Sequence, residues 1–260
     1  MNHSTQPPRI ASLVPSVTEL LAALGLAPFL VARTGYCIHP ADALAAVPKV
    51  GGTKDVNLAK LKRLAPSHVI VNVDENRLET VQALRAFVPE VVVTHPCGPE
   101  DVGALIAQLA AVFSAQQGVA ERAAALADEL QTELRATTPA AWPAEAVLYL
   151  IWRAPWMTVA RDTYISRLLA RVNWLTLPAV DGGERGAARY PTLRGDEPWL
   201  HDVRRVLLSS EPYAFEAGHV GEARALCPNA QVQQVDGELL SWYGSRTVAG
   251  LRCARRLRGT

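Results

Sequence analysis

Residues 9–21 read RIASLVPSVTELL and join a strand pattern directly to a helix pattern. After Arg9, residues 10–14 are apolar or small, which predicts a short strand over residues 9–14. Ser16 is predicted to be the helix N-cap, because Glu19 follows three residues later and completes a capping box before an apolar helix face. A strand that leads at once into a helix is typical of a βα unit around a parallel sheet.

The same alternation of strand and helix patterns continues along both halves of the chain. Further strands are predicted at residues 30–34, 68–73 and 90–94 in the first half, and at 146–152, 157–160, 204–209 and 231–235 in the second. Helices are predicted at residues 58–64, 77–87, 163–171 and 245–258.

Residues 99–135 depart from this pattern, because they are rich in alanine and lack strand signals. They predict mostly helix, broken near Gly118, and the strand pattern restarts only after the turn-forming residues TTPAAWP at 137–143. We therefore predict an α/β fold with two Rossmann-like α/β lobes joined by a single long helix. The expected divisions are an N-terminal lobe at residues 1–112, a linking helix at 113–143 and a C-terminal lobe at 144–260.

The composition is that of an ordinary globular protein. The 260 residues are 49% hydrophobic, and 26 Lys and Arg oppose 25 Asp and Glu, so no basic excess points to nucleic acid. The longest apolar stretch, residues 22–32, contains Gly25 and Pro28 and is too short to span a membrane. We expect a monomer with neither a nucleic-acid partner nor a membrane span.

Two features favour a cytoplasmic location. The first nine residues show no basic stretch followed by an apolar segment, so no secretory signal is predicted. The four cysteines lie far apart, which fits reduced thiols in a reducing compartment; they are Cys37, Cys97, Cys227 and Cys253.

Polar and aromatic residues follow the predicted strands, where ligands of α/β sheets bind. Four large flat side chains suit a broad planar or apolar ligand: Trp152, Trp156, Trp242 and Tyr243. The predicted polar contacts are Tyr36, Thr53, Asn76 and Arg246. The simpler alternative is that the aromatic residues cover the sheet ends and the polar ones cap helices, as Ser16, Asn76 and Ser245 could.

The turn at residues 51–54, Gly-Gly-Thr-Lys, lacks the spacing of a phosphate-binding P-loop, so nucleotide binding is not predicted. It either points Lys54 to solvent or presents Thr53 and backbone N–H groups to a ligand.

A second hypothesis is a bare metal-ion site. Thiolate and imidazole groups suit zinc, and two such pairs follow strands of the first half: Cys37 with His39, and His95 with Cys97. The one-residue spacing is shorter than is usual for structural zinc. Neither a Gly-x-Ser-x-Gly elbow nor a His-Glu-x-x-His helix is present, so neither of these catalytic motifs points to an enzyme.

Residues 9–21, 48–52 and 64–71 resemble the cobalamin- and iron-siderophore-binding proteins of ABC importers, the helical-backbone metal receptors. The resemblance covers nearly the whole chain. The motifs at residues 36–40, 51–54 and 75–77, with SWYGSR at 241–246, look like a subgroup usually labelled cobalamin-binding.

This resemblance implies the class III periplasmic-binding-protein fold, in which one rigid helix joins the lobes and the ligand lies in the cleft between them. It implies a protein that is not an enzyme. Its expected role is capture of cobalamin, another corrinoid or another metal chelate as transported ligand, without an intrinsic cofactor, and delivery to an ABC permease. Family members dock on the permease through one acidic residue per lobe; here the candidates are Glu75 or Glu79, and Glu211 or Glu216.

Two departures from the family pattern concern location. Exported members begin with a signal sequence, and some join a cysteine of the last helix to one of the second lobe, whereas Cys253 finds no partner cysteine at residues 168–174. The family role implies a periplasmic or extracytoplasmic protein, and these departures leave a cytoplasmic one as the alternative, including a cytoplasmic enzyme or enzyme partner on the same fold.

Overall fold

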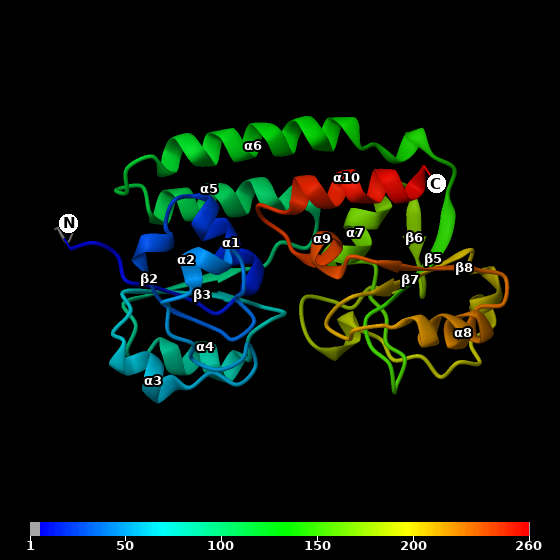
Figure 1. Ribbon diagram of the computed structural model, residues 1–260, viewed down its shortest axis with the longest axis horizontal. Coiled ribbons are helices and arrows are strands. Elements are labelled where there is room, and N and C mark those ends of the chain that lie inside the picture. Colours follow the sequence, from blue (N-terminus) through cyan, green and yellow to red (C-terminus); the bar gives the residue numbers. More distant parts are fainter. Residues whose placement is uncertain (1–5, 260) are drawn as a thin grey trace. The chain divides into compact units, whose positions relative to one another are not determined.

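Two four-stranded parallel sheets organise the computed structural model, which describes residues 6–259 (Figure 1). The first compact unit comprises the chain up to His95 together with Gly103–Asp128, and the second comprises Pro96–Val102 together with the chain from Glu129 onward. Each unit has one sheet with its own helices, which confirms the predicted α/β class with two Rossmann-like lobes.

The sheet of the first unit has the strand order β2-β1-β3-β4, with every neighbouring pair parallel. Its strands are β1 (Ile10–Ser12), β2 (Leu30–Arg33), β3 (His68–Asn72) and β4 (Glu90–Thr94). Its helices are α1 (Pro15–Ala23), η1 (Ala27–Phe29), α2 (Ala41–Leu44), α3 (Leu58–Arg63), α4 (Leu78–Leu84) and α5 (Val102–Val112).

The core of this unit forms where apolar strand residues meet the apolar faces of α3 and α4. Ala11, Ala32, Val69 and Val71 from the strands pack with helix residues Leu61 and Leu84. Burying these side chains stabilises the sheet and fixes its strand ends in place.

The sheet of the second unit repeats this topology in the order β6-β5-β7-β8, again with all pairs parallel. Its strands are β5 (Glu145–Leu150), β6 (Trp174–Thr176), β7 (Arg205–Ser209) and β8 (Gln231–Val235). Its helices are η2 (Pro99–Asp101), η3 (Pro139–Ala141), α7 (Tyr164–Ala170), η4 (Ala187–Arg189), η5 (Pro198–Asp202), α8 (Ala217–Leu226), α9 (Gly237–Ser241) and α10 (Thr247–Arg258).

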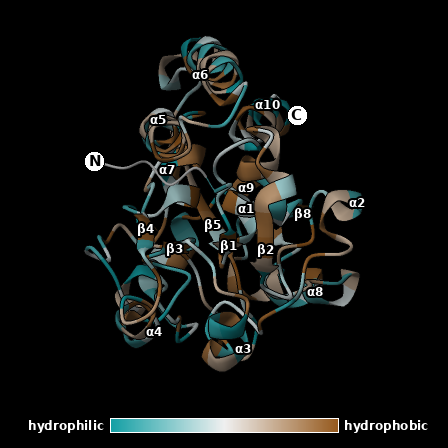
Figure 2. Ribbon diagram, turned by 90° about the vertical axis from the view of Figure 1, so that its left-hand side faces the viewer, coloured by the Kyte–Doolittle hydropathy of each residue, from teal (hydrophilic) through white to brown (hydrophobic). Residues whose placement is uncertain are grey.

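One long helix, α6 (Val119–Ala136), contributes to both units, since its residues up to Asp128 belong to the first and those from Glu129 to the second. It follows Gly118, whose φ of 76° is left-handed, and this confirms the predicted helix break. Figure 2 shows α5 mostly brown, whereas α6 alternates between teal and brown as an amphipathic helix does. Within the described residues, no helix combines the length and apolar character needed to cross a membrane.

Two predictions about the elements are wrong. Ser16 is not an N-cap, because α1 begins at Pro15, whose fixed φ and missing N–H suit the first helical position. Residues 157–160 form no strand, since only Met157 makes isolated bridges, to Trp152 and Thr192.

A largely enclosed cluster of charged side chains lies at the amino-terminal edge of the second sheet. The Glu145 carboxylate accepts from Arg205 Nε at 3.0 Å, from Arg258 Nη1 at 2.6 Å and from Trp174 Nε1 at 3.2 Å. The two guanidinium groups and the carboxylate are almost fully enclosed. This cluster ties β5, β6, β7 and the end of α10 together.

Replacing Glu145 tests this cluster. Because Glu145→Ala leaves two enclosed guanidinium groups without their carboxylate, we expect the free energy of unfolding of the second unit to fall by about 3 kcal/mol. Glu145→Gln, which keeps an acceptor oxygen, should lose less, and exposed Glu184→Ala should change it by less than about 0.5 kcal/mol. Urea unfolding followed by tryptophan fluorescence measures all three, and equal effects of Glu145→Ala and Glu184→Ala would contradict the assignment.

Candidate functional site

The loop after β2 presents Tyr36 at the carboxyl-terminal edge of the first sheet. Buried Arg33 holds this loop, since Nη1 donates to the Cys37 carbonyl at 2.8 Å and Nε donates to two carbonyls further along the loop. The Tyr36 side chain is 64% exposed, and a Cβ added to Gly52 would lie only 3.3 Å from its ring. The phenol ring is therefore placed over the glycine turn and faces solvent.

The Asn76 side chain is buried, and its amide group makes three hydrogen bonds to backbone groups. Its Oδ1 accepts from Asn72 N at 2.9 Å, and its Nδ2 donates to the carbonyls of Leu13 at 3.3 Å and Thr53 at 2.9 Å. One amide thus joins the ends of β1 and β3 to the turn that carries Thr53, which is partly exposed. Nor is Asn76 a helix cap, because the N-cap of α4 is Arg77.

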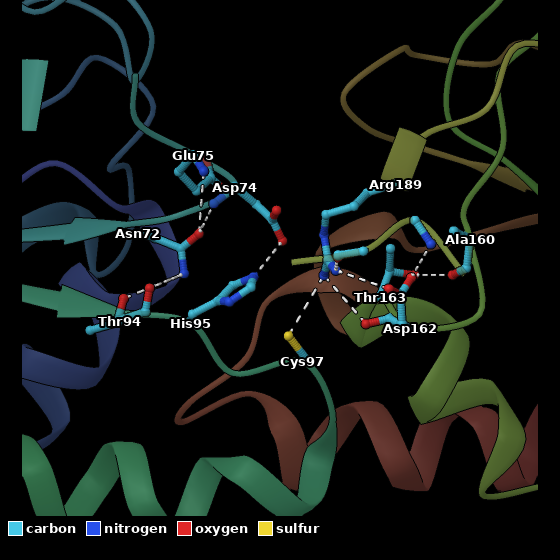
Figure 3. A network of polar contacts seen from close by, with 12 residues as sticks. Asn72, Asp74, Glu75, Thr94, His95, Cys97, Ala160, Asp162, Thr163 and Arg189 are labelled. Carbon is cyan, nitrogen blue, oxygen red and sulfur yellow. Dashed lines mark hydrogen bonds and ion pairs between the residues drawn. The ribbon is translucent and has the colours of Figure 1, made fainter. Parts of the chain in front are cut away.

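A polar network that the sequence did not reveal surrounds the ends of β3 and β4 (Figure 3). Asn72 Oδ1 accepts from the backbone N–H groups of Asp74 and Glu75, and Asn72 Nδ2 donates to the Thr94 carbonyl. Asp74 Oδ2 lies 3.4 Å from His95 Nε2. An acid–imidazole pair is therefore held at this edge.

The four residues of the metal hypothesis do not come together. Cys37 is fully buried, its Sγ lies 3.1 Å from Thr34 Oγ1, and burial raises the pKa of this thiol. Across residues 6–259, no group of three or more His, Cys, Asp or Glu side chains is placed to hold a metal ion.

An aromatic patch lies at the carboxyl-terminal edge of the second sheet; we define it as Trp152, Trp156, Tyr213 and Phe215. Trp152 is 41% exposed and meets Tyr213 edge-on, with ring centroids 5.6 Å apart. Trp156 stacks on Phe215 at 6.0 Å, and Arg153 lies 4.5 Å above the Trp156 ring. Trp152 therefore packs against Tyr213 and is still partly accessible to solvent.

The loop at residues 242–246 is more enclosed than the sequence suggests. Trp242 and Tyr243 are each only 8% exposed, and Tyr243 packs edge-on against Tyr164 at 5.6 Å. Arg246 lies 4.9 Å above the Trp242 ring and pairs with Glu238 at 2.6 Å. Arg246, and not Ser245, is the N-cap residue of α10, so Ser245 is not the cap that the simpler alternative requires.

Cys97 lies beside a buried guanidinium group, which sequence spacing could not reveal (Figure 3). Arg189 is 1% exposed; its Nη1 lies 3.6 Å from Asp162 Oδ2, and its Nη2 donates to Cys97 Sγ at 3.7 Å. The Cys97 N–H donates to Asp101 at 2.8 Å, so both the backbone and the thiol of Cys97 are fixed.

The acidic candidates for permease docking differ in exposure. Glu79 is exposed in the first turn of α4, and Glu216 is exposed at the N-cap of α8, where it forms a capping box with His219. Glu75 and Glu211 are only partly exposed, and the Glu211 carboxylate accepts from Trp242 Nε1 at 2.7 Å.

Two parallel α/β lobes that share one long helix define the class III periplasmic-binding-protein fold. A family model described as "Periplasmic binding protein" matches residues 10–180, and the chain belongs to this family. A search of curated protein sequences gave no significant match.

Several solved structures share this fold. The chain is similar to the periplasmic vitamin B12 binding protein BtuF of Vibrio cholerae, with a TM-score of 0.80, 19% sequence identity, and 97% of this chain and 96% of that chain covered. It is also similar to the periplasmic heme binding protein HutB of Vibrio cholerae, with a TM-score of 0.75, 21% identity, and 97% and 98% covered. A periplasmic heme binding protein from Pseudomonas aeruginosa gives a TM-score of 0.78, 22% identity, and 98% and 94% covered.

The different environments of the four cysteines predict their reactivity. Burial raises the pKa of Cys37 and of Cys253 and raises the pKa of Cys227 to about 12, so these buried thiols have little reactive thiolate at mildly alkaline pH. Cys97 is partly exposed. We expect one fast thiol per native chain with a disulfide reagent, and four thiols after denaturation without reductant.

The fast phase should disappear in Cys97→Ser and persist in Cys227→Ser. A fast phase that survives Cys97→Ser, or only two thiols after denaturation, would contradict the assignment.

Proposed function

We propose that this protein is the solute receptor of an ABC importer and that its ligand is a flat metal chelate, with a corrinoid as the first candidate. Membership of the periplasmic binding protein family supports the receptor role. The similar fold of the vitamin B12 binding protein BtuF supports a corrinoid as ligand. The observation that carries the proposal is the 41% exposure of Trp152, which follows β5 at the carboxyl-terminal edge of the second sheet.

The aromatic patch suits a broad, flat ligand. Tyr213 packs against Phe215 at 4.8 Å, and Tyr213 Oη lies 3.1 Å from His219 Nε2, so the side chain behind Trp152 is itself fixed. An indole that is already ordered loses little conformational entropy when a ligand stacks on it. Trp152 therefore offers a preorganised surface of the kind that planar ligands bind.

In the first unit, the proposal assigns ligand contact to Tyr36 and Thr53, which are exposed or partly exposed. Buried Asn76 positions the Thr53 turn instead of contacting ligand. In the second unit, the proposal assigns stacking to Trp152 and support of the patch to Trp156. It assigns further ligand contacts to Trp242, Tyr243 and Arg246 of the 242–246 loop.

Heme is the second candidate ligand. The fold similarity to HutB and to the Pseudomonas aeruginosa heme binding protein favours it. The exposed phenol of Tyr36 also favours heme, because tyrosine oxygen can serve as an axial ligand of heme iron.

The proposed partner is an ABC permease, contacted through one acidic residue of each unit. Glu79 and Glu216 are the best candidates, because both carboxylates are exposed at the first turn or the N-cap of a helix. This role requires an extracytoplasmic location, which the family description supports.

Ligand titration of tryptophan variants tests the proposal. Cobinamide, cyanocobalamin or hemin should quench the tryptophan fluorescence saturably. Stacking on one aromatic ring contributes about 1 kcal/mol, so Trp152→Ala should weaken binding about five- to tenfold. Trp152→Phe should retain most of the affinity, because it keeps a flat ring.

Trp142→Phe is the matched control, since Trp142 precedes β5 at the opposite edge of the second sheet. Its affinity should equal that of the unmodified protein. Absence of saturable quenching by all three chelates at high micromolar concentration would exclude the proposed ligand class.

A further inference from the structure

Glu211 follows β7 and is held rigidly at the edge of the second sheet. Buried Ser209 fixes its backbone, because Ser209 Oγ donates to the Glu211 carbonyl at 2.6 Å and accepts from Glu211 N at 3.3 Å. Tyr149 Oη donates to the same Ser209 Oγ at 2.9 Å. Gly237 packs so closely that a Cβ there would lie 2.8 Å from Glu211 Cγ. The carboxylate therefore has a defined position.

One oxygen of this carboxylate anchors the 242–246 loop. Glu211 Oε1 accepts from Trp242 Nε1 at 2.7 Å and from Ser241 Oγ at 2.9 Å. The Trp242 ring in turn supports the Arg246 guanidinium group, which pairs with Glu238. The orientation of Trp242, and through it that of Arg246, depends on Glu211 Oε1.

The negative charge on Glu211 is unfavourable for folding. Burial raises the pKa of Glu211 above its usual range and outweighs the lowering by the Ser241 and Trp242 hydrogen bonds, while Glu238 and Asp236 raise it further. The positively charged Arg246 belongs to the same loop, but its guanidinium group pairs with Glu238. Two further titratable side chains of this region are Tyr149 and Cys253.

The direction of this shift determines how stability depends on pH. A carboxyl group whose pKa is higher in the folded state destabilises the fold as pH rises from the unfolded pKa through the folded pKa, and has no effect below the unfolded value. The charged Glu211 carboxylate therefore does not stabilise the fold, and its presence at this position needs another explanation.

We propose, on the basis of the function proposed above, that Glu211 is a positioning residue whose carboxylate orients Trp242 and Arg246 for ligand binding, so that binding weakens when this carboxylate is protonated or replaced by a neutral group. Hydrogen bonds to a charged acceptor are roughly twice as strong as those to a neutral one. The charged form therefore holds the loop in one orientation more firmly than the neutral form does.

Glu211→Gln and Glu211→Ala test the proposal by cobinamide binding, with hemin in parallel, from about pH 5 to about pH 8. Near neutral pH, Glu211→Gln should weaken binding about fivefold and Glu211→Ala about tenfold or more. The affinity of the unmodified protein should fall with pH towards that of Glu211→Gln, whose own affinity should not follow this titration. Glu184→Gln removes an exposed carboxylate of the same unit and should behave like the unmodified protein.

The urea concentration at which the protein unfolds distinguishes a positioning role of Glu211 from a merely structural one. Near neutral pH, Glu211→Gln should unfold at the same or a higher urea concentration than the unmodified protein, although it binds less tightly. Equal affinity and equal pH dependence in Glu211→Gln and the unmodified protein would overturn the proposal and leave the receptor function intact.

If the unmodified protein binds no chelate, the proposed function fails, and amide hydrogen exchange of the ligand-free protein then decides the positioning role. Exchange in residues 241–246 should be fastest in Glu211→Ala and intermediate in Glu211→Gln, whose amide oxygen is a neutral and weaker acceptor. Unchanged exchange in Glu211→Ala would overturn the positioning role.

Discussion

Parallel pairing of the strands is the constraint on which the functional edges depend. In a parallel sheet every strand ends at the same edge, so the four loops that follow the strands meet there. These loops carry backbone polar groups that need hydrogen-bond partners once they are buried. Buried Asn76 supplies such partners in the first unit, where its amide donates to two loop carbonyls. In the second unit, partly exposed Glu211 holds a loop through side chains, because its carboxylate accepts from Ser241 Oγ and Trp242 Nε1.

The two units hold the loops that follow their strands with different side chains. Neutral Asn76 both donates and accepts, and it joins three backbone segments of the first unit. Glu211 only accepts, and it places two side-chain donors of the second unit on one oxygen. A partly buried carboxylate with a raised pKa reduces stability when it is charged, whereas a hydrogen-bonded amide does not. This difference is why Glu211, and not Asn76, is the residue for which a role in binding must be sought.

Sequence patterns predicted the fold well because strand and helix periodicity are local properties. Strands β4 and β8 match the predicted ends, but the strand β6 and the helix α8 were missed, since β6 spans three residues and α8 contains Gly218 and Gly221. The site was predicted less well, because exposure depends on distant partners. Trp152 follows the strand β5, whereas Trp242 follows the short helix α9 and donates to Glu211, 31 residues away in the sequence. Local patterns could not show that Trp152 is exposed and Trp242 is enclosed.

Selective retention of a flat chelate is the central claim of this account. Native mass spectrometry of the purified protein, incubated with equal amounts of cyanocobalamin, hemin and a non-planar iron siderophore, tests it directly. The account predicts one flat chelate bound per chain and no retained siderophore. Retention of the siderophore alone, or of none of the three, would contradict it.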